Sequence, residues 1–275
     1  MDFIQALILG IAQGATEFLP VSSSGHLVLL PWWLNWSVPP DLIFTVAAHL
    51  GTLCAVLVYF RKEWITVFKG GMILLKTRSL STPESRLFLY LVIGSIPIGV
   101  IGSLFARPLE SAFQQPVFAA GFLLVTAALL IFSERHNDNP GNHMRKMDEM
   151  NWRDAFFVGV AQLLAVFPGI SRSGSTIAAG LFRGISRTDA ARFSFLLGTP
   201  AIMGAGVLAG LELISANNLV SRLPLLLVGF VSAAVVGYLA IAFLLNHLQH
   251  HRLYVFAAYC TAVGLVSLLA ALIGR

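Results

Sequence analysis

The chain has 275 residues, of which 57% are hydrophobic and 11% are charged, and its formal net charge is +5. So few charged residues, with a mean hydropathy of +0.80, exclude a water-soluble globular domain and predict an integral membrane protein. The excess of Lys and Arg does not indicate a nucleic-acid partner, because these residues lie in short stretches between apolar runs. Cys54 and Cys260 each lie within an apolar run and lack the spacing of a metal or redox motif.

Two apolar stretches are each interrupted midway. The first, from Phe3 to Leu34, is broken by Pro20 and a run of serines, and the second, from Ala155 to Phe182, is broken by Pro168 and Gly169. Proline cannot donate a hydrogen bond to a helix, so we expect each stretch to form two short helices with a break inside the membrane. Broken backbone at that depth is tolerated only where protein or a water-filled cavity surrounds it.

Six longer apolar runs can each cross a bilayer as one helix, which takes roughly 20 residues. They are Leu42–Phe60, Leu87–Ala106, Val117–Ser133, Phe193–Ile214, Pro224–Leu245 and Leu253–Ile273. The predicted fold class is therefore all-α. We expect one polytopic membrane domain over residues 1–275, with about six full transmembrane helices and two re-entrant broken hairpins.

The two interrupted stretches repeat each other without a gap. GIAQ at Gly10–Gln13 recurs as GVAQ at Gly159–Gln162, and VSSSG at Val21–Gly25 recurs as ISRSG at Ile170–Gly174. Both recurrences are 149 positions apart (162 − 13 and 170 − 21). Such a repeat in an apolar chain indicates two duplicated halves.

Loop charges predict how these halves are oriented. We place the halves at residues 1–133 and 155–275, joined by a cytoplasmic linker at 134–154. No Lys or Arg precedes Arg61, whereas six basic residues lie between Arg61 and Arg86, which predicts that this stretch is a cytoplasmic loop. The first interrupted segment would then enter from the outer side and the second from the cytoplasmic side. The two hairpins should meet near the midplane as an inverted-topology repeat.

The polar residues of the two hairpins suggest a site for a phosphoryl group. The first hairpin carries Glu17, Ser23 and His26, and the second carries Arg172 in the place of Ser23. A guanidinium among hydroxyls at a helix start matches the oxygens of a phosphate. A carboxylate and an imidazole add the capacity for proton transfer or metal binding. The residues that we expect to bind the ligand are Gln13, Ser22, Gly169, Ser171, Ser173 and Thr176.

Each of these residues also has a structural interpretation. Glu17 could pair with Arg172 only to hold the hairpins together, and His26 could be a hydrogen-bonded structural histidine. Any single serine here is more often a helix cap than a nucleophile. We expect His49, on an apolar span, to pack or to form a hydrogen bond between helices.

The chain resembles the undecaprenyl-diphosphate phosphatase family, also called bacitracin-resistance proteins, over nearly its whole length. The motifs that carry the resemblance are (Glu/Gln)-x-x-x-Glu at Gln13 and Glu17, FLPVSSSGH at Phe18–His26, PGISRSGST at Pro168–Thr176 and ARFSFLL at Ala191–Leu197. The resemblance implies a bacterial inner-membrane enzyme, with its site open to the periplasm, that hydrolyses undecaprenyl diphosphate to undecaprenyl phosphate. That reaction recycles the lipid carrier for cell-wall synthesis and confers bacitracin resistance.

The resemblance also implies roles for individual residues. Arg172, with Ser171, Ser173 and Thr176, would clamp the diphosphate. Glu17 would bind a divalent cation, Mg²⁺ or Ca²⁺, or act as a general base, and His26 would transfer protons. Ser23 is the candidate nucleophile, with a water molecule activated by the metal and Glu17 as the alternative. The partners of the protein would be a prenyl diphosphate lipid and membrane lipids, with no nucleic acid. The protein could also form a homodimer.

Two other classes of protein share parts of this pattern. Inverted repeats with broken helices are typical of secondary transporters, so a transporter or a lipid-carrier flippase is an alternative. The type 2 phosphatidic acid phosphatases share a Ser-Gly-His sequence, but they also need a His six residues after an Arg. Ala178 stands six residues after Arg172, and Phe193 stands six residues after Arg187.

Overall fold

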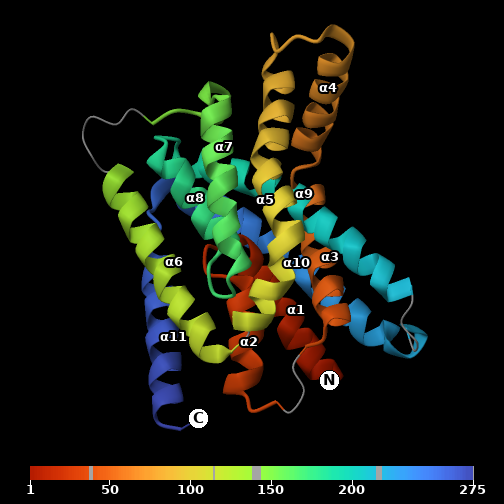
Figure 1. The fold of residues 1–275 in the computed structure, drawn as a ribbon, viewed down its shortest axis with the longest axis vertical. Coiled ribbons are helices and arrows are strands. Elements are labelled where there is room, and N and C mark those ends of the chain that lie inside the picture. Colours follow the sequence, from red (N-terminus) through yellow and green to blue (C-terminus); the bar gives the residue numbers. More distant parts are fainter. Residues whose placement is uncertain (37–39, 114, 138–143, 215–218, 275) are drawn as a thin grey trace.

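A computed structural model describes residues 1–36, 40–113, 115–137, 144–214 and 219–274, without the side chains of 103, 105–113, 205, 207–214 and 219–221. Over these residues the chain is helical and contains no strand, which confirms the all-α class (Figure 1). The helices are α1 (Phe3–Phe18), α2 (Ser23–Trp33), α3 (Leu42–Tyr59), α4 (Arg61–Thr77), α5 (Pro83–Phe113), α6 (Pro116–Asn137), η1 (Met147–Glu149), α7 (Trp152–Ala161), η2 (Gln162–Val166), α8 (Arg172–Phe182), α9 (Arg187–Ile214), α10 (Leu219–His250) and α11 (Tyr254–Leu272).

Five helices in the described part of the chain are long and apolar enough to cross a membrane. They are α3, residues Pro83–Gly102 of α5, α6, residues Arg222–His250 of α10, and α11. These five correspond to five of the six predicted spans. The sixth, Phe193–Ile214, is helical within α9, but most of its side chains beyond Gly204 lie outside the described residues.

The stretch that we predicted as a cytoplasmic loop, between Arg61 and Arg86, is mostly the helix α4. This helix packs against α5 so closely that a Cβ at Gly70 would lie 2.1 Å from the carbonyl oxygen of Glu84. Its outward face carries the exposed apolar residues Ile65, Phe68, Met72 and Leu75. The predicted connection between spans is therefore mostly helical, which charge counts do not reveal, because they predict the side of a membrane on which a segment lies and not its backbone conformation.

The structure repeats the two hairpins in the register that the sequence shows. Each hairpin has a helix, a break near its proline and a second helix. The first helices, α1 and α7, begin at Phe3 and Trp152. The second helices, α2 and α8, run over Ser23–Trp33 and Arg172–Phe182. Each pair of positions differs by 149 residues (152 − 3, 172 − 23 and 182 − 33). The breaks therefore follow from the shared sequence pattern, as predicted.

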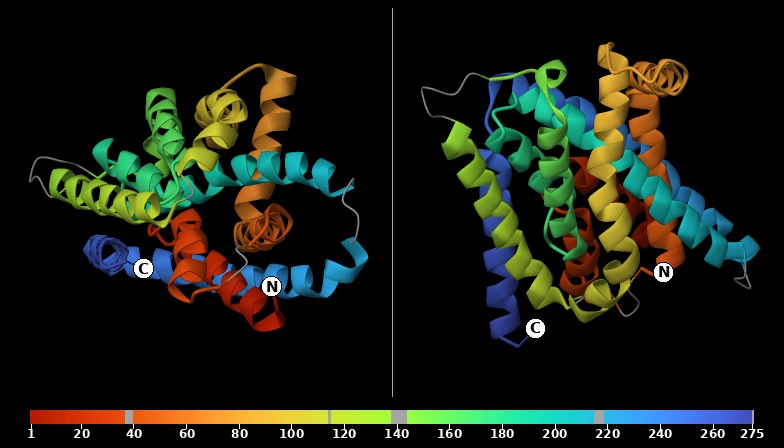
Figure 2. Two further views of the ribbon diagram at one scale, coloured as in Figure 1. Left: turned by 60° about the horizontal axis from the view of Figure 1, so that its bottom comes forward. Right: turned by 45° about the horizontal axis from the view of Figure 1, so that its top comes forward.

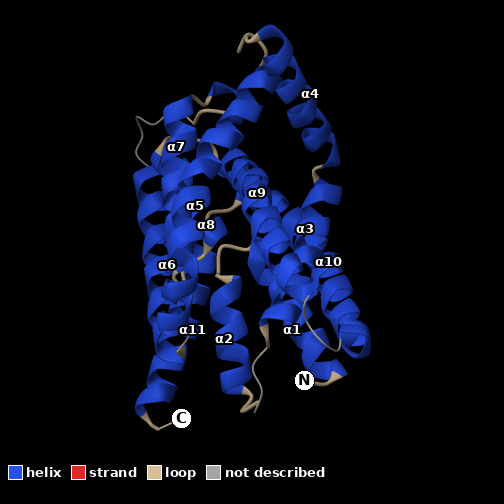
Figure 3. Cartoon of the chain, turned by 45° about the vertical axis from the view of Figure 1, so that its right-hand side comes forward, coloured by secondary structure: helices blue, strands red, loops and turns tan. Residues whose placement is uncertain are grey.

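The two hairpins enter the bundle from opposite ends and their turns meet in its middle. Figures 1 and 3 show α1 and α2 in the lower half and α7 and α8 in the upper half, with the breaks between them. Figure 2 shows α6 and α11 side by side at one edge of the bundle. Glycines allow the hairpins to pack closely on spanning helices: a Cβ at Gly14 would lie 2.7 Å from the Ala233 oxygen of α10, and one at Gly159 would lie 2.3 Å from the Gly94 oxygen of α5.

Two buried carboxylates join the helix ends near the predicted linker, of which residues 138–143 lie outside the described part. Glu134, at the end of α6, accepts a hydrogen bond of 2.6 Å from Arg187 of α9. Asp154, in the first turn of α7, accepts hydrogen bonds from Arg145 at 2.9 Å and from Arg183 at 2.7 Å. Both carboxylates are fully buried, so these ion pairs fix how α6, α7, α8 and α9 meet at this end of the bundle.

Candidate active site

The first residues of α2 and α8 hold equivalent positions in the two halves. Ser22 caps α2 by accepting a hydrogen bond of 3.3 Å from the Gly25 amide, and Ser171 caps α8 by accepting one of 3.0 Å from the Gly174 amide. The next residue is Ser23 in α2 and Arg172 in α8. Capping therefore aims a hydroxyl from one hairpin and a guanidinium from the other at the point where the turns meet.

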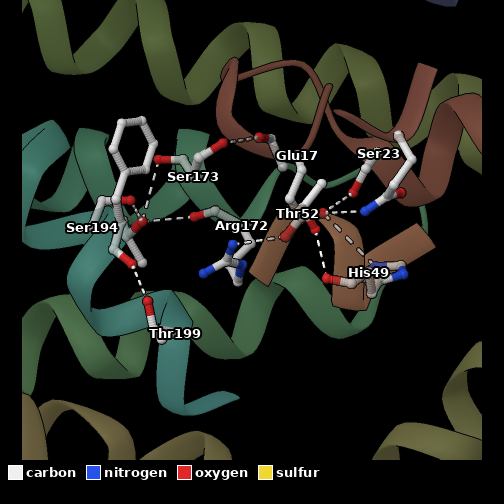
Figure 4. Close-up of polar contacts among 12 residues, drawn as sticks. Glu17, Ser23, His49, Thr52, Arg172, Ser173, Ser194 and Thr199 are labelled. Atoms are coloured by element: carbon white, nitrogen blue, oxygen red, sulfur yellow. Dashed lines mark hydrogen bonds and ion pairs between the residues drawn. The ribbon is translucent and has the colours of Figure 1, made fainter. Parts of the chain in front are cut away.

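Glu17, near the end of α1, lies at that point and is hydrogen bonded by both residues (Figure 4). Its Oε2 accepts a hydrogen bond of 2.6 Å from Ser23 Oγ, and its Oε1 accepts one of 2.7 Å from Arg172 Nη2. Gln13, one turn earlier, donates from Nε2 to Oε2 at 3.0 Å. Only 5% of the Glu17 side chain and 16% of the Arg172 side chain are exposed, so the carboxylate is a buried charge with a partly buried partner. The structure thus brings together Glu17, Ser23 and Arg172.

The guanidinium of Arg172 rests against the backbone of α9. A Cβ built on Gly198 would lie 1.3 Å from Arg172 Nη1, so only glycine leaves room for the side chain in this position. The sequence motif at Ala191–Leu197 stops one residue short of this glycine, and sequence analysis missed it. The sequence signal for it is weak: a glycine that directly follows the mostly apolar Phe193–Leu197.

The hydroxyls predicted to clamp a phosphate have other partners in this structure. Ser173 Oγ donates to the Leu19 carbonyl oxygen of the first hairpin at 3.1 Å and lies 3.2 Å from Ser171 Oγ. Thr176 Oγ1 donates to the Arg172 carbonyl oxygen at 2.7 Å and lies 2.6 Å from Ser194 Oγ. These bonds hold the two turns and the start of α8 in place around the guanidinium.

Gly169 shapes the second turn. Its φ of +106° lies in the region that favours glycine, and a Cβ there would lie 2.3 Å from the Ala119 oxygen of α6. Its carbonyl oxygen accepts a hydrogen bond of 2.9 Å from Thr126 Oγ1, which in turn accepts one of 3.0 Å from the Ser171 amide. Thr126 thereby anchors the turn to α6, so α6 positions the hairpin that carries Arg172.

His26 lies beside the site and faces another helix. Its Nδ1 is 2.7 Å from the Ser22 carbonyl oxygen, and its Nε2 is 2.8 Å from the hydroxyl of Tyr259 on α11. The two rings are stacked, with centroids 5.6 Å apart. Because a carbonyl only accepts, Nδ1 carries a proton, and Nε2 of the neutral ring can accept from Tyr259. The structure thus places His26 with Tyr259, which sequence analysis missed because it lies 233 residues further along the chain.

A second histidine reaches the carboxylate instead. His49 of α3 places its Nε2 3.8 Å from Glu17 Oε2, within ion-pair range. We had expected His49 to pack or to form a hydrogen bond between helices. The signal for a different role was a lone imidazole in an otherwise apolar span.

The oxygen atoms around Glu17 suit a divalent cation of the kind the family resemblance implies. Gln13 Oε1 is buried and has no hydrogen-bond partner, although the Nε2 of the same side chain bonds to Glu17. Amide and carboxylate oxygens are ligands that Mg²⁺ and Ca²⁺ prefer. Among the described residues no group of three or more His, Cys, Asp and Glu side chains could hold a metal ion.

The fold and the site define a polytopic membrane protein with a buried polar site. Its two broken hairpins hold a carboxylate, a hydroxyl and a guanidinium together inside an apolar helical bundle. The family model described as Bacitracin resistance protein BacA matches residues 6–266, and the chain belongs to this family. A protein named undecaprenyl-diphosphatase from Thermomicrobium roseum is 44% identical, with 100% of each chain covered. Proteins of the same name from Methanosphaera stadtmanae and Desulforudis audaxviator are 41% and 38% identical, with 99% of each chain covered.

Proposed function

We propose that this protein is an integral-membrane phosphatase that hydrolyses undecaprenyl diphosphate to undecaprenyl phosphate and inorganic phosphate. The reaction recycles the lipid carrier for cell-wall synthesis and underlies bacitracin resistance. The observation that carries the proposal is the carboxylate of Glu17, which accepts hydrogen bonds from Ser23 at 2.6 Å and from Arg172 at 2.7 Å. The family and the name shared by its relatives support the same substrate.

Arg172 binds the diphosphate in this proposal. Its planar guanidinium presents several N–H donors to phosphate oxygens and stays charged at any physiological pH. Gly198 and Glu17 hold the guanidinium in place before the substrate arrives, so little reorganisation is needed when charge develops on the transferring phosphoryl group. Ser171 and Ser173 join the two turns beside it and complete the polar wall of the site.

In this proposal Ser23 acts as the nucleophile and Glu17 as its base. The Ser23 hydroxyl already donates to Glu17 Oε2, so its proton has an acceptor as Oγ bonds to the terminal phosphorus. The bond between that phosphorus and the bridging oxygen breaks, and the lipid phosphate leaves as an anion. Water then hydrolyses the phosphoserine to release inorganic phosphate. Direct attack by a water molecule that Glu17 activates is the alternative.

His26 supports this step from behind the first turn. Its Nδ1–H donates to the carbonyl oxygen of Ser22, the residue that caps α2 and precedes Ser23. Tyr259 holds the opposite ring nitrogen at 2.8 Å. In the proposal His26 fixes the orientation of Ser23 and offers its Nε2 for proton exchange with Tyr259, which is partly exposed.

Glu17 and Gln13 would hold the divalent cation, Mg²⁺ or Ca²⁺. When bound, the ion supplies positive charge to the phosphate oxygens in the transition state. Because the Glu17 charge is matched by Arg172 before substrate binds, a diphosphate adds negative charge that this ion pair does not balance. That imbalance supports a requirement for a cation with the substrate.

The orientation that we propose places the open end of the first hairpin on the outer, periplasmic side of a bacterial inner membrane. The end of the bundle that carries α4 has Lys62, Lys69 and Lys76, and the same end carries the arginines around Asp154 (Figure 1). Basic residues concentrate on the cytoplasmic side of membrane proteins. The α1–α2 hairpin therefore opens toward the other side.

Phosphate release from undecaprenyl diphosphate by the purified protein, with and without a chelator, tests the reaction and the cation together. We expect Glu17→Gln to lower kcat by about 10³-fold, because the variant loses both the base and the charge that positions Arg172. Glu63→Gln is the matched control, since Glu63 also pairs with an arginine, Arg192 at 2.8 Å, but outside the site. Release by Glu17→Gln within a few-fold of wild type would refute the proposed site. Lipid movement without phosphate release would instead favour a transporter or flippase.

A further inference from the structure

A groove with a volume of about 510 Å³ runs along α3, outside the site described above. We call it the α3 groove. Six of its lining residues follow one another at spacings of three or four positions, so they form a single stripe on the helix surface. They are Leu50, Leu53, Cys54, Leu57, Val58 and Arg61, and Phe230 of α10 completes the lining. The groove is therefore apolar except at one end, where Arg61 lies.

The α3 groove has about the length of one membrane leaflet. Leu50 lies near the middle of α3, and it precedes Arg61 by 11 residues (61 − 50), which corresponds to roughly 16 Å of helix. Half of the hydrocarbon core of a bilayer measures about 15 Å. At the Leu50 end, a Cβ at Gly206 of α9 would lie 3.0 Å from Leu50 Cδ2, so α9 bounds the groove there. The groove thus leads from the middle of the membrane to the end that carries α4.

Arg61 brings positive charge to that end of the groove. Its Nη1 donates a hydrogen bond of 3.3 Å to the Val58 carbonyl oxygen, which holds the guanidinium over the end of α3. The next residue, Lys62, is also exposed. Among the described residues neither cation forms an ion pair with a carboxylate, and the acid that follows them, Glu63, pairs with Arg192 at 2.8 Å. The end of the groove therefore attracts an anion.

We propose that the α3 groove binds an anionic phospholipid of the leaflet on the α4 side, which is the cytoplasmic leaflet in the orientation proposed above. One acyl chain lies along the apolar stripe from Leu50 to Val58. The headgroup phosphate faces Arg61, whose forked donors match phosphate oxygens, and Lys62 adds a second positive charge. Basic residues beside membrane-spanning helices attract anionic lipids in this way. The site is separate from the residues that react with the substrate.

The charge at the end of the groove selects a phospholipid over the prenyl chain of the substrate. In the proposed function the diphosphate lies at Arg172, in the middle of the bundle. A prenyl chain that ran from there along the α3 groove would place hydrocarbon beside Arg61, and hydrocarbon offers no acceptor to a guanidinium. A phospholipid of the α4-side leaflet places its phosphate at that position and its acyl chain toward the membrane centre.

Cys54 allows the occupancy of the groove to be measured directly. This thiol is exposed and lines the groove, whereas the other cysteine, Cys260, is fully buried. The rate at which a maleimide alkylates Cys54 in detergent micelles should therefore fall as lipid fills the groove. We expect phosphatidylglycerol to give half-maximal protection at a mole fraction at least about fivefold lower than phosphatidylcholine, because each basic residue near an anionic lipid contributes about fivefold in affinity.

Variants of Arg61 test the role of its charge. Arg61→Gln should raise the half-protecting mole fraction of phosphatidylglycerol by about fivefold and leave that of phosphatidylcholine unchanged. Arg61→Lys keeps the charge and should keep most of the preference. Lys76→Gln is the matched control, because it removes one exposed positive charge from the last turn of α4, away from the groove, and should behave as wild type does.

Three results would overturn this inference. They are equal protection by the two lipids, no protection by either, and unchanged protection by phosphatidylglycerol in Arg61→Gln. Phosphate release by Arg61→Gln should keep the wild-type KM for undecaprenyl diphosphate, and a raised KM would instead assign the groove to the prenyl chain. Protection of Cys54 is measured without substrate. If wild type released no phosphate, the proposed function would fail while the lipid site could still be confirmed.

Discussion

Gly198→Ala should inactivate the protein by displacing the guanidinium of Arg172. The new Cβ would lie 1.3 Å from Nη1, 2.4 Å from Cζ and 2.8 Å from Nη2, whereas ordinary contacts begin at 3.4 Å. The guanidinium must therefore move by about 2 Å, which breaks its 2.7 Å hydrogen bond to Glu17. Because a misplacement of about 1 Å can cost about 10² in rate, we expect kcat/KM to fall by about 10²- to 10³-fold.

The assay for this prediction is phosphate release in detergent micelles, with Gly204→Ala as the matched control. Gly204 lies in the same helix, α9, and a Cβ there meets nothing within 4 Å, so this variant should keep wild-type activity. Both variants should elute as wild type does, because replacing Gly by Ala favours a helix. If Gly198→Ala keeps kcat/KM within about threefold of wild type, the fixed position of Arg172 does not matter for the reaction.

Two further predictions concern stability. Burial raises the pKa of Asp154, but hydrogen bonds, first of all from Arg145, outweigh burial and hold this pKa below its ordinary value of 3.8. The stabilisation is thus complete above about pH 5 and is lost as pH falls through the lowered folded-state pKa, so Asp154→Asn should lower Tm at pH 7, and this Tm difference should shrink as the pH falls below 3.8. A Tm difference that stays constant from pH 7 down to the acid-unfolding limit would contradict this reasoning. Gly159→Ala should separate α7 from α5, since its Cβ would lie 2.3 Å from the Gly94 oxygen. We expect the free energy of unfolding to fall by about 1–3 kcal/mol, measured by thermal unfolding. Gly121→Ala is the control, because a Cβ there meets nothing within 4 Å.

The sequence predicted the fold well because proline and glycine act locally. Pro20 and Pro168 lie in the two breaks, and the equal spacing of the hairpin helices follows from the repeat. It did not predict that Arg61–Thr77 form the helix α4, because the charge pattern of a connecting segment predicts its side of the membrane and not its backbone conformation.

For the site, the sequence predicted that Glu17 and Arg172 would meet, and the structure brings them together. The sequence also predicted that His26 would join Glu17 and Arg172, but the His26 ring faces Tyr259 on α11 instead. The contact of His49 with Glu17 and the role of Gly198 were not predicted, for a related reason. The rotation of a spanning helix about its own axis depends on contacts with distant segments, which periodicity within that helix does not reveal.

The equivalence of Ser23 and Arg172 has a consequence for how such a pocket could arise. Two halves of identical sequence would carry the same residue at both positions. In this chain the positions differ, so that one supplies a hydroxyl and the other a guanidinium, and each bonds to a different oxygen of Glu17. One carboxylate can have two unlike donors beside it only because the sequences of the two halves have diverged.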